Sequence, residues 1–281
     1  MSDIANKVET LMEAMPYLQK YQGKIIVIKY GGNAMINEEL KDAVMHDVVL
    51  LKLLGMKPVL SHGGGPGINK MLEKLDIPVE FIEGLRYTSA DIMRVVEMVL
   101  VGQVNTELVG FINKLGGKAV GLSGVSGDIY HCHQRDEVHG YVGDIDYVDP
   151  KPIFAMLDAG YIPVIAPVGT DGQGHTFNIN GDTAAGKLAS ALGAEKLVIL
   201  TDIEGLCNDI KIRDVISYLN IEDVKALKDK GTIAGGMIPK VNCCVECVRQ
   251  GVERANIKDG RVPHSILIEL LTNEGVGTMF S

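Results

Sequence analysis

The segment 24–30 constrains the fold more than any other part of the chain. It reads Lys-Ile-Ile-Val-Ile-Lys-Tyr, so four consecutive positions carry β-branched apolar side chains. A strand without polar residues at alternate positions has both faces buried, which is typical of the interior of a parallel sheet. Parallel strands need long crossover connections, usually helices. The segment therefore predicts an α/β fold.

Strand and helix patterns alternate along the rest of the chain, as a parallel sheet requires. Helix patterns cover 38–54, 66–75, 91–114, 150–159 and 182–192, and strand patterns cover 57–62, 118–122, 161–166 and 196–201. The stretch 125–148 predicts inserted β-hairpins. The C-terminal third predicts helices at 221–229, 237–250 and 264–271, with strands at 252–257 and 276–280. We therefore predict a three-layer αβα sandwich around a central, mainly parallel sheet.

An additional helix precedes the first strand. Residues 4–20 place apolar side chains on one face of a helix, which Pro16 should end or kink. We interpret residues 1–20 as an oligomerisation helix, with packing on the chain's own core as the alternative. The restart of a strand at residue 196 suggests two lobes, 21–195 and 196–281.

Composition excludes several classes of function. The net charge of −9 leaves no cationic surplus for a nucleic acid backbone, and the chain has no tryptophan for base stacking. Five cysteines form an odd and uneven set, which favours a reducing cytoplasm over a disulfide framework. The sequence presents neither a signal peptide nor an apolar stretch of about 18 residues. We expect a cytoplasmic protein that binds neither nucleic acid nor membrane.

Glycine is abundant, with 33 residues, and four glycine-rich turns each follow a strand or open a helix. Such turns bring backbone N–H groups and helix N-termini close to a ligand, and both bind anions. One such turn alone is usually only a turn, but several at the carboxyl ends of parallel strands would converge on one crevice. The usual G-x-x-x-x-G-K-[ST] and G-x-G-x-x-G motifs are absent. The four turns are Lys29-Tyr30-Gly31-Gly32-Asn33-Ala34, His62-Gly63-Gly64-Gly65-Pro66-Gly67, Asn178-Ile179-Asn180-Gly181-Asp182-Thr183 and Gly235-Gly236-Met237-Ile238-Pro239-Lys240.

Lys29 and Lys240 are the most informative cations. Lys29 ends the buried strand, where an ammonium group is costly unless it meets an anion, and Lys240 follows a glycine turn at a helix start. Taken alone, each lysine is equally well explained as a surface residue whose stem packs on apolar neighbours. Asp182 is a carboxylate that could hold both ammonium groups. The three residues together predict a phosphoryl-transfer site, which depends on positioning and charge neutralisation.

The order and spacing of these motifs resemble the amino-acid kinase family. The resemblance is carried by Lys29-x-Gly-Gly, His62-Gly-Gly-Gly, Asn178-x-Asn-x-Asp182 and Gly235-Gly-Met-x-x-Lys240. Within the family, Glu83-Gly84-Leu85-Arg86 and Phe177-Asn178-Ile179-Asn180 are similar to the branch that phosphorylates N-acetyl-L-glutamate. The resemblance covers the chain from about residue 10 to its end.

The resemblance implies that ATP phosphorylates the side-chain carboxylate of N-acetyl-L-glutamate, giving N-acetyl-L-glutamyl 5-phosphate in arginine biosynthesis. Lys29 and Lys240 would stabilise the transferred phosphoryl group, and Asp182 would organise the two lysines. Mg²⁺ would arrive with ATP, without a metal site of the protein's own. Residues 21–195 would form the N-acetylglutamate lobe and 196–281 the ATP lobe. Substrate contacts would come from Gly64, Gly65, Arg86 and Asn178, and nucleotide contacts from Gly31, Gly32, Asp202, Gly205, Thr232 and Ala234.

Several other features have simpler interpretations. His62 either makes a polar contact in the site or shapes its turn, and no general base is needed because the acceptor carboxylate is already ionised at neutral pH. Gly181 stands where the family more often has alanine. Cys244-Val-Glu-Cys247 lacks partners at zinc spacing, and His131-Cys132-His133 lacks a third ligand, so we predict no metal site.

Both ends of the chain resemble a branch of these kinases that L-arginine inhibits. In that branch N-terminal helices interlace three dimers, so we expect a homo-oligomer arranged as a trimer of dimers. Glu269 would pair with the arginine guanidinium. The arginine pocket would be completed by Tyr17, His264, Gly275 and Gly277.

Two alternatives stay open at this point. One is a related kinase whose acceptor is glutamate, aspartate, carbamate or UMP. The other is a catalytically silent arginine sensor, against which the presence of both Lys29 and Lys240 argues. The sequence also leaves open a PII-type signalling protein as a regulatory partner.

Overall fold

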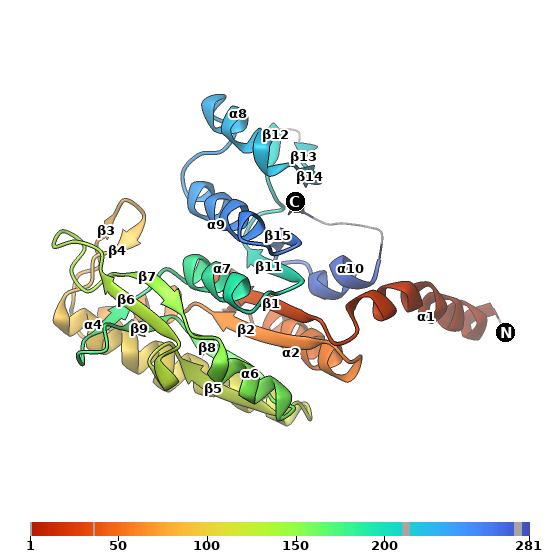
Figure 1. Cartoon of the computed structure of the whole chain (residues 1–281), viewed down its shortest axis with the longest axis horizontal. Helices are drawn as coiled ribbons and strands as arrows, with labels where there is room; N and C mark the ends of the chain where they lie inside the picture. The colour runs from red at the N-terminus through yellow and green to blue at the C-terminus, as the bar shows by residue number, and fades with distance from the viewer. Residues whose placement is uncertain (1, 36, 210–213, 273–276) are drawn as a thin grey trace.

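The central element is an eight-stranded sheet in a computed structural model that describes residues 2–35, 37–209, 214–272 and 277–281. The strands lie in the order β14-β16-β15-β11-β1-β2-β8-β5 (Figure 1). All neighbouring pairs are parallel except β15 with β16, which confirms the predicted mainly parallel sheet. The strands are β1 (Ile25–Tyr30), β2 (Lys57–His62), β5 (Ala119–Ser123), β8 (Ile162–Ala166), β11 (Lys196–Thr201), β14 (Tyr218–Leu219), β15 (Arg254–Asp259) and β16 (Thr278–Phe280).

Helices cover both faces of this sheet, so the three-layer prediction is confirmed. Val27 belongs to a core formed with α6 (Lys151–Asp158), α7 (Gly181–Ala191) and α9 (Met237–Arg249). Its neighbours Ile26 and Ile28 belong to a second core formed with α2 (Glu38–Leu53), α5 (Thr106–Lys114) and α10 (Ser265–Leu271). Alternate residues of β1 therefore serve opposite cores, which explains why the strand carries no polar face.

The predicted helix 91–114 is one continuous helix with an irregular centre. It consists of α4 (Ala90–Glu97), the π-helical segment η2 (Met98–Asn105) and α5. By length and mean hydropathy, 1.5, Ala90–Lys114 is the one helix among the described residues that could cross a membrane. Here it packs with α3 (Gly65–Lys74) in a third apolar cluster and borders β5 and β8. It is therefore a core helix of this fold.

Smaller β-elements lie at the edge of the main sheet. The predicted hairpin in 125–148 is confirmed as β6 (Tyr130–Gln134) and β7 (Gly143–Val148). A second hairpin, β9 (Val168–Thr170) with β10 (Thr176–Asn178), extends it to four strands and was not predicted. Short pairs are β3 (Phe81–Ile82) with β4 (Leu85–Arg86) and β12 (Cys207–Asp209) with β13 (Asp214–Val215); single helical turns are η1 (Gly32–Met35), η3 (Ser126–Asp128) and η4 (Ile221–Asp223), followed by α8 (Val224–Asp229).

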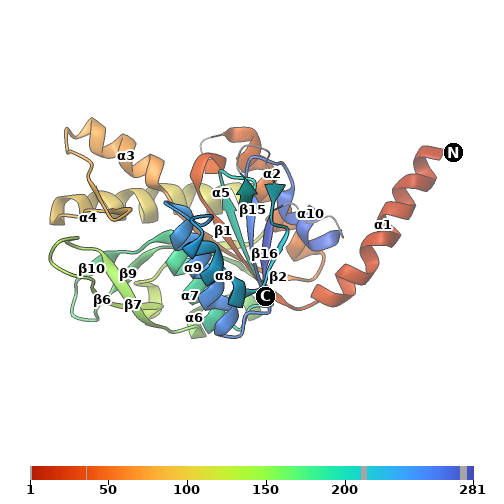
Figure 2. The same cartoon turned by 90° about the horizontal axis from the view of Figure 1, so that it is seen from above.

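The N-terminal helix α1 (Ser2–Tyr21) extends away from the body of the molecule (Figure 2). Only its end is anchored, since Tyr21 is buried while Leu11 is 70% exposed. The helix continues through Pro16, so of the two predicted effects, an end or a kink, the structure excludes the end. The predicted lobe boundary falls just before β11, which lies beside β1 in the same sheet. The division into two lobes stays a prediction.

Candidate active site

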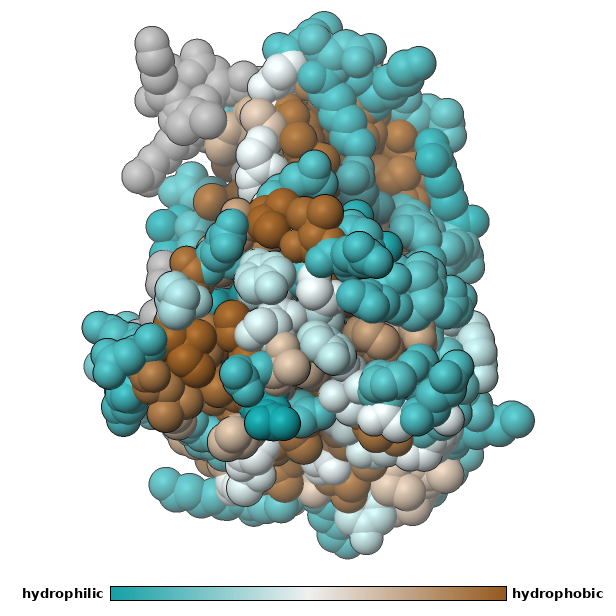
Figure 3. All heavy atoms as spheres, turned by 90° about the vertical axis from the view of Figure 1, so that its left-hand side faces the viewer, coloured by the Kyte–Doolittle hydropathy of each residue, from teal (hydrophilic) through white to brown (hydrophobic). Residues whose placement is uncertain are grey.

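A cavity of about 610 Å³ lies at the carboxyl ends of β1, β2 and β11. Three of the four predicted glycine turns line it, 29–34, 62–67 and 178–183, together with Asp202 after β11. The fourth turn, 235–240, does not line the cavity, although its Lys240 reaches Asp182. Figure 3 views the molecule from the β3–β4 side, where apolar patches interrupt a hydrophilic surface. The cavity brings together nine of the predicted site residues: Lys29, Gly31, Gly32, Gly64, Gly65, Arg86, Asn178, Asp182 and Asp202.

Asp182 joins the two predicted lysines. Lys29 Nζ lies 2.9 Å from Asp182 Oδ1, and Lys240 Nζ lies 2.6 Å from Oδ2. The Lys29 and Asp182 side chains are nearly buried, and that of Lys240 is 20% exposed. Two ammonium groups are thus fixed on either side of one carboxylate, leaving one net positive charge beside the cavity.

The start of α7 positions Asp182. Asn180 is the N-cap, and its Oδ1 accepts hydrogen bonds from the backbone N–H groups of Asp182 and Thr183 at 3.0 and 3.1 Å. Burial raises the pKa of Asp182, but the ammonium groups of Lys29 and Lys240 outweigh it and hold the pKa at about 2. The carboxylate therefore stays ionised throughout the physiological pH range.

Glycine in the first turn lets two charged side chains approach the backbone closely. A Cβ on Gly31 would lie 2.6 Å from Lys29 Nζ, and a Cβ on Gly32 would lie 2.6 Å from Asp202 Oδ1. Gly32 also has a φ of 70°, which side-chain-bearing residues rarely adopt. The turn therefore brings backbone between a lysine and an aspartate, where a phosphate group can approach its N–H groups.

The second glycine turn opens α3. Gly64 is the N-cap of this helix, and Pro66 occupies the first turn, so the N-terminus of α3 faces the cavity with unpaired N–H groups. His62 does not project into the cavity. It is 0% exposed, and burial lowers its pKa to about 4. Of the two interpretations offered for His62, the one in which it shapes the turn fits this geometry.

Arg86 supplies a further cation to the lining of the cavity, beside the start of α3, where its Nη2 lies 3.5 Å from the Gly65 carbonyl oxygen. Its Nη2 donates to Asn69 Oδ1 at 2.5 Å, and its guanidinium carbon lies 4.9 Å from the centre of the Phe81 ring. Among the described residues, the buried Nη1 has no hydrogen-bond acceptor. Asn178 lines the same cavity and donates to Thr88 Oγ1 at 3.1 Å. The pair can therefore bind a small carboxylate, as predicted, and Asn69 is a supporting residue that the sequence did not indicate.

Gly181 lies close to the second glycine turn and to the side chain of Lys29. A Cβ there would lie 3.7 Å from both Gly63 Cα and Lys29 Cε, which is ordinary van der Waals contact. Alanine, which the sequence comparison with the family led us to expect, would fit this space.

The remaining predicted nucleotide residues lie outside the lining of this cavity. Gly205 is buried, and a Cβ on it would lie 2.9 Å from Thr278 Oγ1. Thr232 and Ala234 lie in the connection between α8 and α9, where the Thr232 N–H donates to the Leu227 carbonyl. Their contact with a nucleotide stays a prediction.

The predicted arginine residues are only partly brought together. Tyr17 and Glu269 line a second cavity, of about 420 Å³. His264 lies elsewhere and pairs with the buried Asp47, with 2.5 Å between Nδ1 and Oδ1. Gly277 packs against β15, since a Cβ there would lie 2.2 Å from the Ile257 carbonyl oxygen. Gly275 lies outside the described residues.

The Glu269 carboxylate already has partners in this second cavity. Lys196 Nζ lies 2.5 Å from Oε1, Lys258 forms an ion pair with Oε2, and Asn256 Nδ2 donates to Oε1 at 2.9 Å. The side chains of Glu269 and both lysines are almost fully buried. A guanidinium would therefore have to compete with two ammonium groups for this carboxylate.

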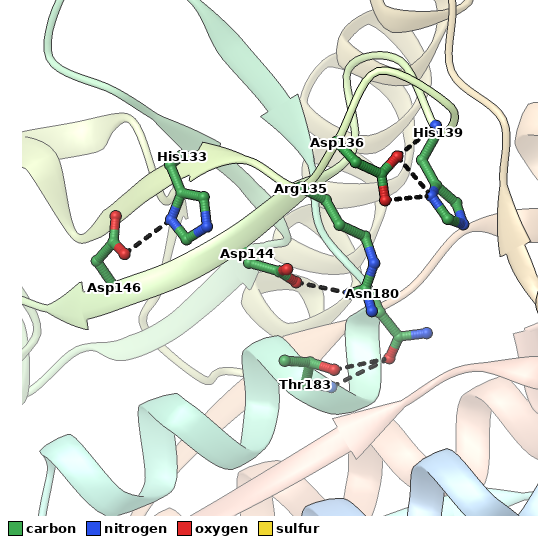
Figure 4. A network of polar contacts seen from close by, with 8 residues as sticks. All are labelled: His133, Arg135, Asp136, His139, Asp144, Asp146, Asn180 and Thr183. Carbon is green, nitrogen blue, oxygen red and sulfur yellow. Dashed lines mark hydrogen bonds and ion pairs between the residues drawn. The ribbon is translucent and has the colours of Figure 1, made fainter.

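The polar side chains around the β6–β7 hairpin pair with acidic residues nearby. His133 pairs with Asp146, His139 with Asp136, and Arg135 with Asp144, all around the β6–β7 hairpin (Figure 4). Each histidine shown there is paired with its own aspartate. Across the described part of the chain, no group of three His, Cys, Asp or Glu side chains is placed to hold a metal ion.

Comparisons with known proteins agree with this geometry. Residues 24–259 match the amino acid kinase family. The chain is 51% identical over 286 residues to an acetylglutamate kinase from Heliobacterium modesticaldum, with 97% of each chain covered, and 50% identical over 277 residues to one from Thermoanaerobacter pseudethanolicus, covering 97% of this chain and 92% of the relative. A solved N-acetylglutamate synthase from Neisseria gonorrhoeae superposes with a TM-score of 0.86 at 26% identity, over 98% of this chain and 63% of that one. The chain therefore belongs to the amino acid kinase family, and within it to the ATP-dependent acetylglutamate kinases.

Proposed function

We propose that this protein transfers the γ-phosphoryl group of ATP to the side-chain carboxylate of N-acetyl-L-glutamate in the cytoplasm. The observation that supports this most directly is the arrangement of Lys29, Asp182 and Lys240 beside a cavity that also holds Arg86. The first three provide charge neutralisation for a phosphoryl group, and Arg86 provides a separate cation for a second carboxylate. The related synthase from Neisseria gonorrhoeae was crystallised with N-acetyl-glutamate, which agrees with an acceptor of this kind.

In this mechanism the acceptor binds between the α3 N-terminus and Arg86. Its α-carboxylate pairs with Arg86 and Asn178, so its side-chain carboxylate points toward the lysines. Gly64 and Gly65 offer backbone N–H groups to the reacting end. The acceptor carboxylate attacks as an anion, so the site needs no base to deprotonate it.

Phosphoryl transfer places negative charge on the oxygens of the transferred group. Lys29 and Lys240 approach these oxygens from two sides, and Asp182 keeps the ammonium groups at a fixed spacing. Gly31 and Gly32 offer N–H groups to the ATP phosphates. Since both lysines are held before substrate binds, little reorganisation is needed during reaction.

Mg²⁺ would enter this site with ATP. The cavity has carboxylate oxygens from Asp182 and Asp202, and the first is held by two lysines. The ion would therefore be bound chiefly by phosphate oxygens, where it neutralises charge on the β and γ groups. Asp202, beside Gly32, is the residue of this chain best placed to support it.

The acceptor is tested by an ADP-release assay with N-acetyl-L-glutamate, L-glutamate, L-aspartate, carbamate and UMP. We expect turnover with the acetylated amino acid to exceed that with every other acceptor by at least about a hundredfold. Arg86 and Asn178 would bind its α-carboxylate while the lysines meet its side-chain carboxylate, and L-glutamate would bring an additional ammonium group beside the Arg86 guanidinium. Faster turnover with any of the other acceptors would assign the protein to a different branch of the family.

We further propose inhibition by L-arginine through the second cavity. Lys20, Lys196, Arg254 and Lys258 give this cavity a positive surplus over Glu269, which suits an amino-acid carboxylate. Among the described residues that line it, Glu269 is the acidic group available to the guanidinium. Tyr17 of α1 completes one wall. The helix α1 exposes an apolar face, which agrees with assembly of dimers into a trimer of dimers.

Removal of residues 1–20 tests both parts of this regulatory proposal. We expect the shortened protein to keep its turnover without arginine, to require at least tenfold more arginine for half inhibition, and to sediment as a dimer. Unchanged turnover of the full-length protein at saturating arginine would contradict the proposed inhibition. A full-length dimer would contradict the proposed assembly.

A further inference from the structure

The long helix 90–114 turns π-helical beside the substrate turn, and this brings one polar side chain into the core. We propose that Asn105, the last residue of the π-helical segment, is a positioning residue that fixes the second glycine turn through His62. The inference rests on the proposed role of Gly64 and Gly65 in acceptor binding.

Asn105 is 5% exposed and lies beneath the sheet edge. Its Nδ2 donates to the carbonyl oxygens of Val164 at 2.9 Å and Leu122 at 3.2 Å, and lies 3.0 Å from His62 Nε2. These acceptors belong to β8, β5 and β2, which are three different strands. An asparagine held by three strands cannot rotate without breaking all three contacts.

These contacts determine the tautomer of His62. Because a carbonyl oxygen only accepts, the proton lies on His62 Nδ1, which donates to the Gly63 carbonyl oxygen at 2.8 Å. In the neutral ring Nε2 is then an acceptor, and the two N–H groups of Asn105 are shared among it and the two strand carbonyls. The low pKa of the buried ring, about 4, keeps it neutral, so this pattern persists at physiological pH. Asn105 thus sets, through His62, the direction of the peptide that precedes Gly64.

The same π-helical segment forms the surface on which the glycine turn lies. A Cβ on Gly64 would lie 2.4 Å from Leu100 Cδ2, and one on Gly67 would lie 3.1 Å from Val99 Cγ1. On the other side, a Cβ on Gly121 would lie 2.0 Å from Asn105 Oδ1, so glycine in β5 leaves room for the amide. A π-turn changes which side chains face the sheet, and such turns occur frequently at functional sites. In this protein the π-helical segment places Leu100 against Gly64 and Asn105 against His62.

The test compares Asn105→Leu with His62→Asn and with the double variant. We expect Asn105→Leu to raise the KM for N-acetyl-L-glutamate roughly tenfold, the effect of losing one hydrogen bond to a buried group, with the KM for ATP unchanged. If Asn105 acts through His62, the double variant should match His62→Asn rather than show the product of both effects. Asn113→Ala is the control, because Asn113 lies on the same helix and caps only the Ala119 N–H, at 2.8 Å.

A folded Asn105→Leu protein with an unchanged KM for the acceptor would overturn the proposal, as would effects that multiply in the double variant. Should Asn105→Leu fail to fold, ¹⁵N spectra of histidine-labelled wild-type protein decide the matter. We expect the His62 signals, assigned by their loss in His62→Asn, to show the Nδ1–H tautomer without titration from about pH 5.5 to 8. The other tautomer, or a protonated ring, would refute the inference. Wild-type protein inactive on N-acetyl-L-glutamate would instead refute the proposed function and leave the tautomer result standing.

Discussion

Asp182 holds both lysines of the active site, and Asp182→Asn removes its charge while keeping its size. The substituted amide can accept a hydrogen bond from one lysine but attracts neither ammonium group as a carboxylate does. Lys29 and Lys240 are then two buried or half-buried cations that share no counter-ion at this position. We expect Asp182→Asn to lower both the free energy of unfolding and kcat.

The size of the stability effect follows from the pKa of Asp182. Burial raises that pKa, yet the two ammonium groups lower it from 3.8 to about 2. This difference corresponds to about 2–3 kcal/mol in favour of the folded, ionised state. Because the folded pKa is the depressed one, the contribution is complete above about pH 4 and is lost as pH falls through about 2, with roughly half remaining at pH 3. Asp182→Asn should therefore lower the free energy of unfolding by about 2–3 kcal/mol at pH 7 and by clearly less at pH 3.

Turnover should fall because the ammonium groups lose their fixed spacing. We expect kcat to drop about a hundredfold at saturating ATP and acceptor, since misplacement by about 1 Å has effects of that order. Urea denaturation at pH 7, 5 and 3 and ADP release at pH 7 measure the two effects. Asp158→Asn is the control, because Asp158 pairs with Lys57 at 3.2 Å on the surface and should matter little. An unfolding difference that stays constant from pH 7 to 3, or a kcat within threefold of wild type, would refute this reasoning.

The other predictions concern single residues of the same cavity. Lys240→Ala should lower kcat by about two to three orders of magnitude with a small change in either KM, measured by ADP release, and full turnover would instead favour the silent-sensor alternative. Arg86→Lys keeps the charge but loses the planar guanidinium and its stacking on Phe81. The KM for N-acetyl-L-glutamate should therefore rise about tenfold while the KM for ATP stays constant. Equal changes in both KM values would contradict a role at the acceptor. Gly181→Ala should leave kcat unchanged and raise the free energy of unfolding by about 0.5–1 kcal/mol in urea, because its Cβ meets no atom closer than 3.7 Å, and destabilisation would show that the turn is tighter than the structure has it.

The fold could be predicted where burial leaves a pattern in the sequence. β1, β2, β8 and β11 have mainly apolar centres because helices cover both faces of the sheet, and their predicted bounds agree with the structure to within a residue or two. β9 and β10 have three residues each, too few to show a period. Pro16 was expected to end or kink α1, and the helix continues through it. A proline removes one helical hydrogen bond and crowds the preceding turn, which need not end a helix. The π-turn at Met98–Asn105 also leaves the apolar pattern of its helix unbroken.

The active site could be predicted where its chemistry depends on local motifs. The glycine turns were recognisable because several of them recur after strands, and Lys29 because a lysine is unusual in a buried strand. Asn69 and Asn105 were missed, since their partners Arg86 and His62 lie 17 and 43 residues away in the sequence. Nothing local distinguishes such an asparagine from a surface one.

The same reasoning that identified Lys29 would have identified the partners of Glu269. Lys196 opens the largely apolar strand β11, and Lys258 lies within β15, which also carries Arg254, Asn256 and Asp259. Each lysine is at most 2% exposed, so each required a buried anion. The sequence assigned Glu269 only to an external guanidinium. In the structure both lysines already pair with Glu269, so the proposed binding of L-arginine must compete with them.

The distribution of charge explains how an acidic protein can bind two anionic substrates. With a net charge of −9, the surface as a whole repels ATP and N-acetyl-L-glutamate. Exposed charges are screened within about 8 Å at physiological ionic strength, whereas buried charges are screened much less. The cations at the cavity, Lys29, Lys240 and Arg86, are mostly buried, and the N-termini of α3 and α7 point the same way. Electrostatic attraction is therefore confined to the cavity. An anion is stabilised only when its charged groups reach these cations and helix N-termini.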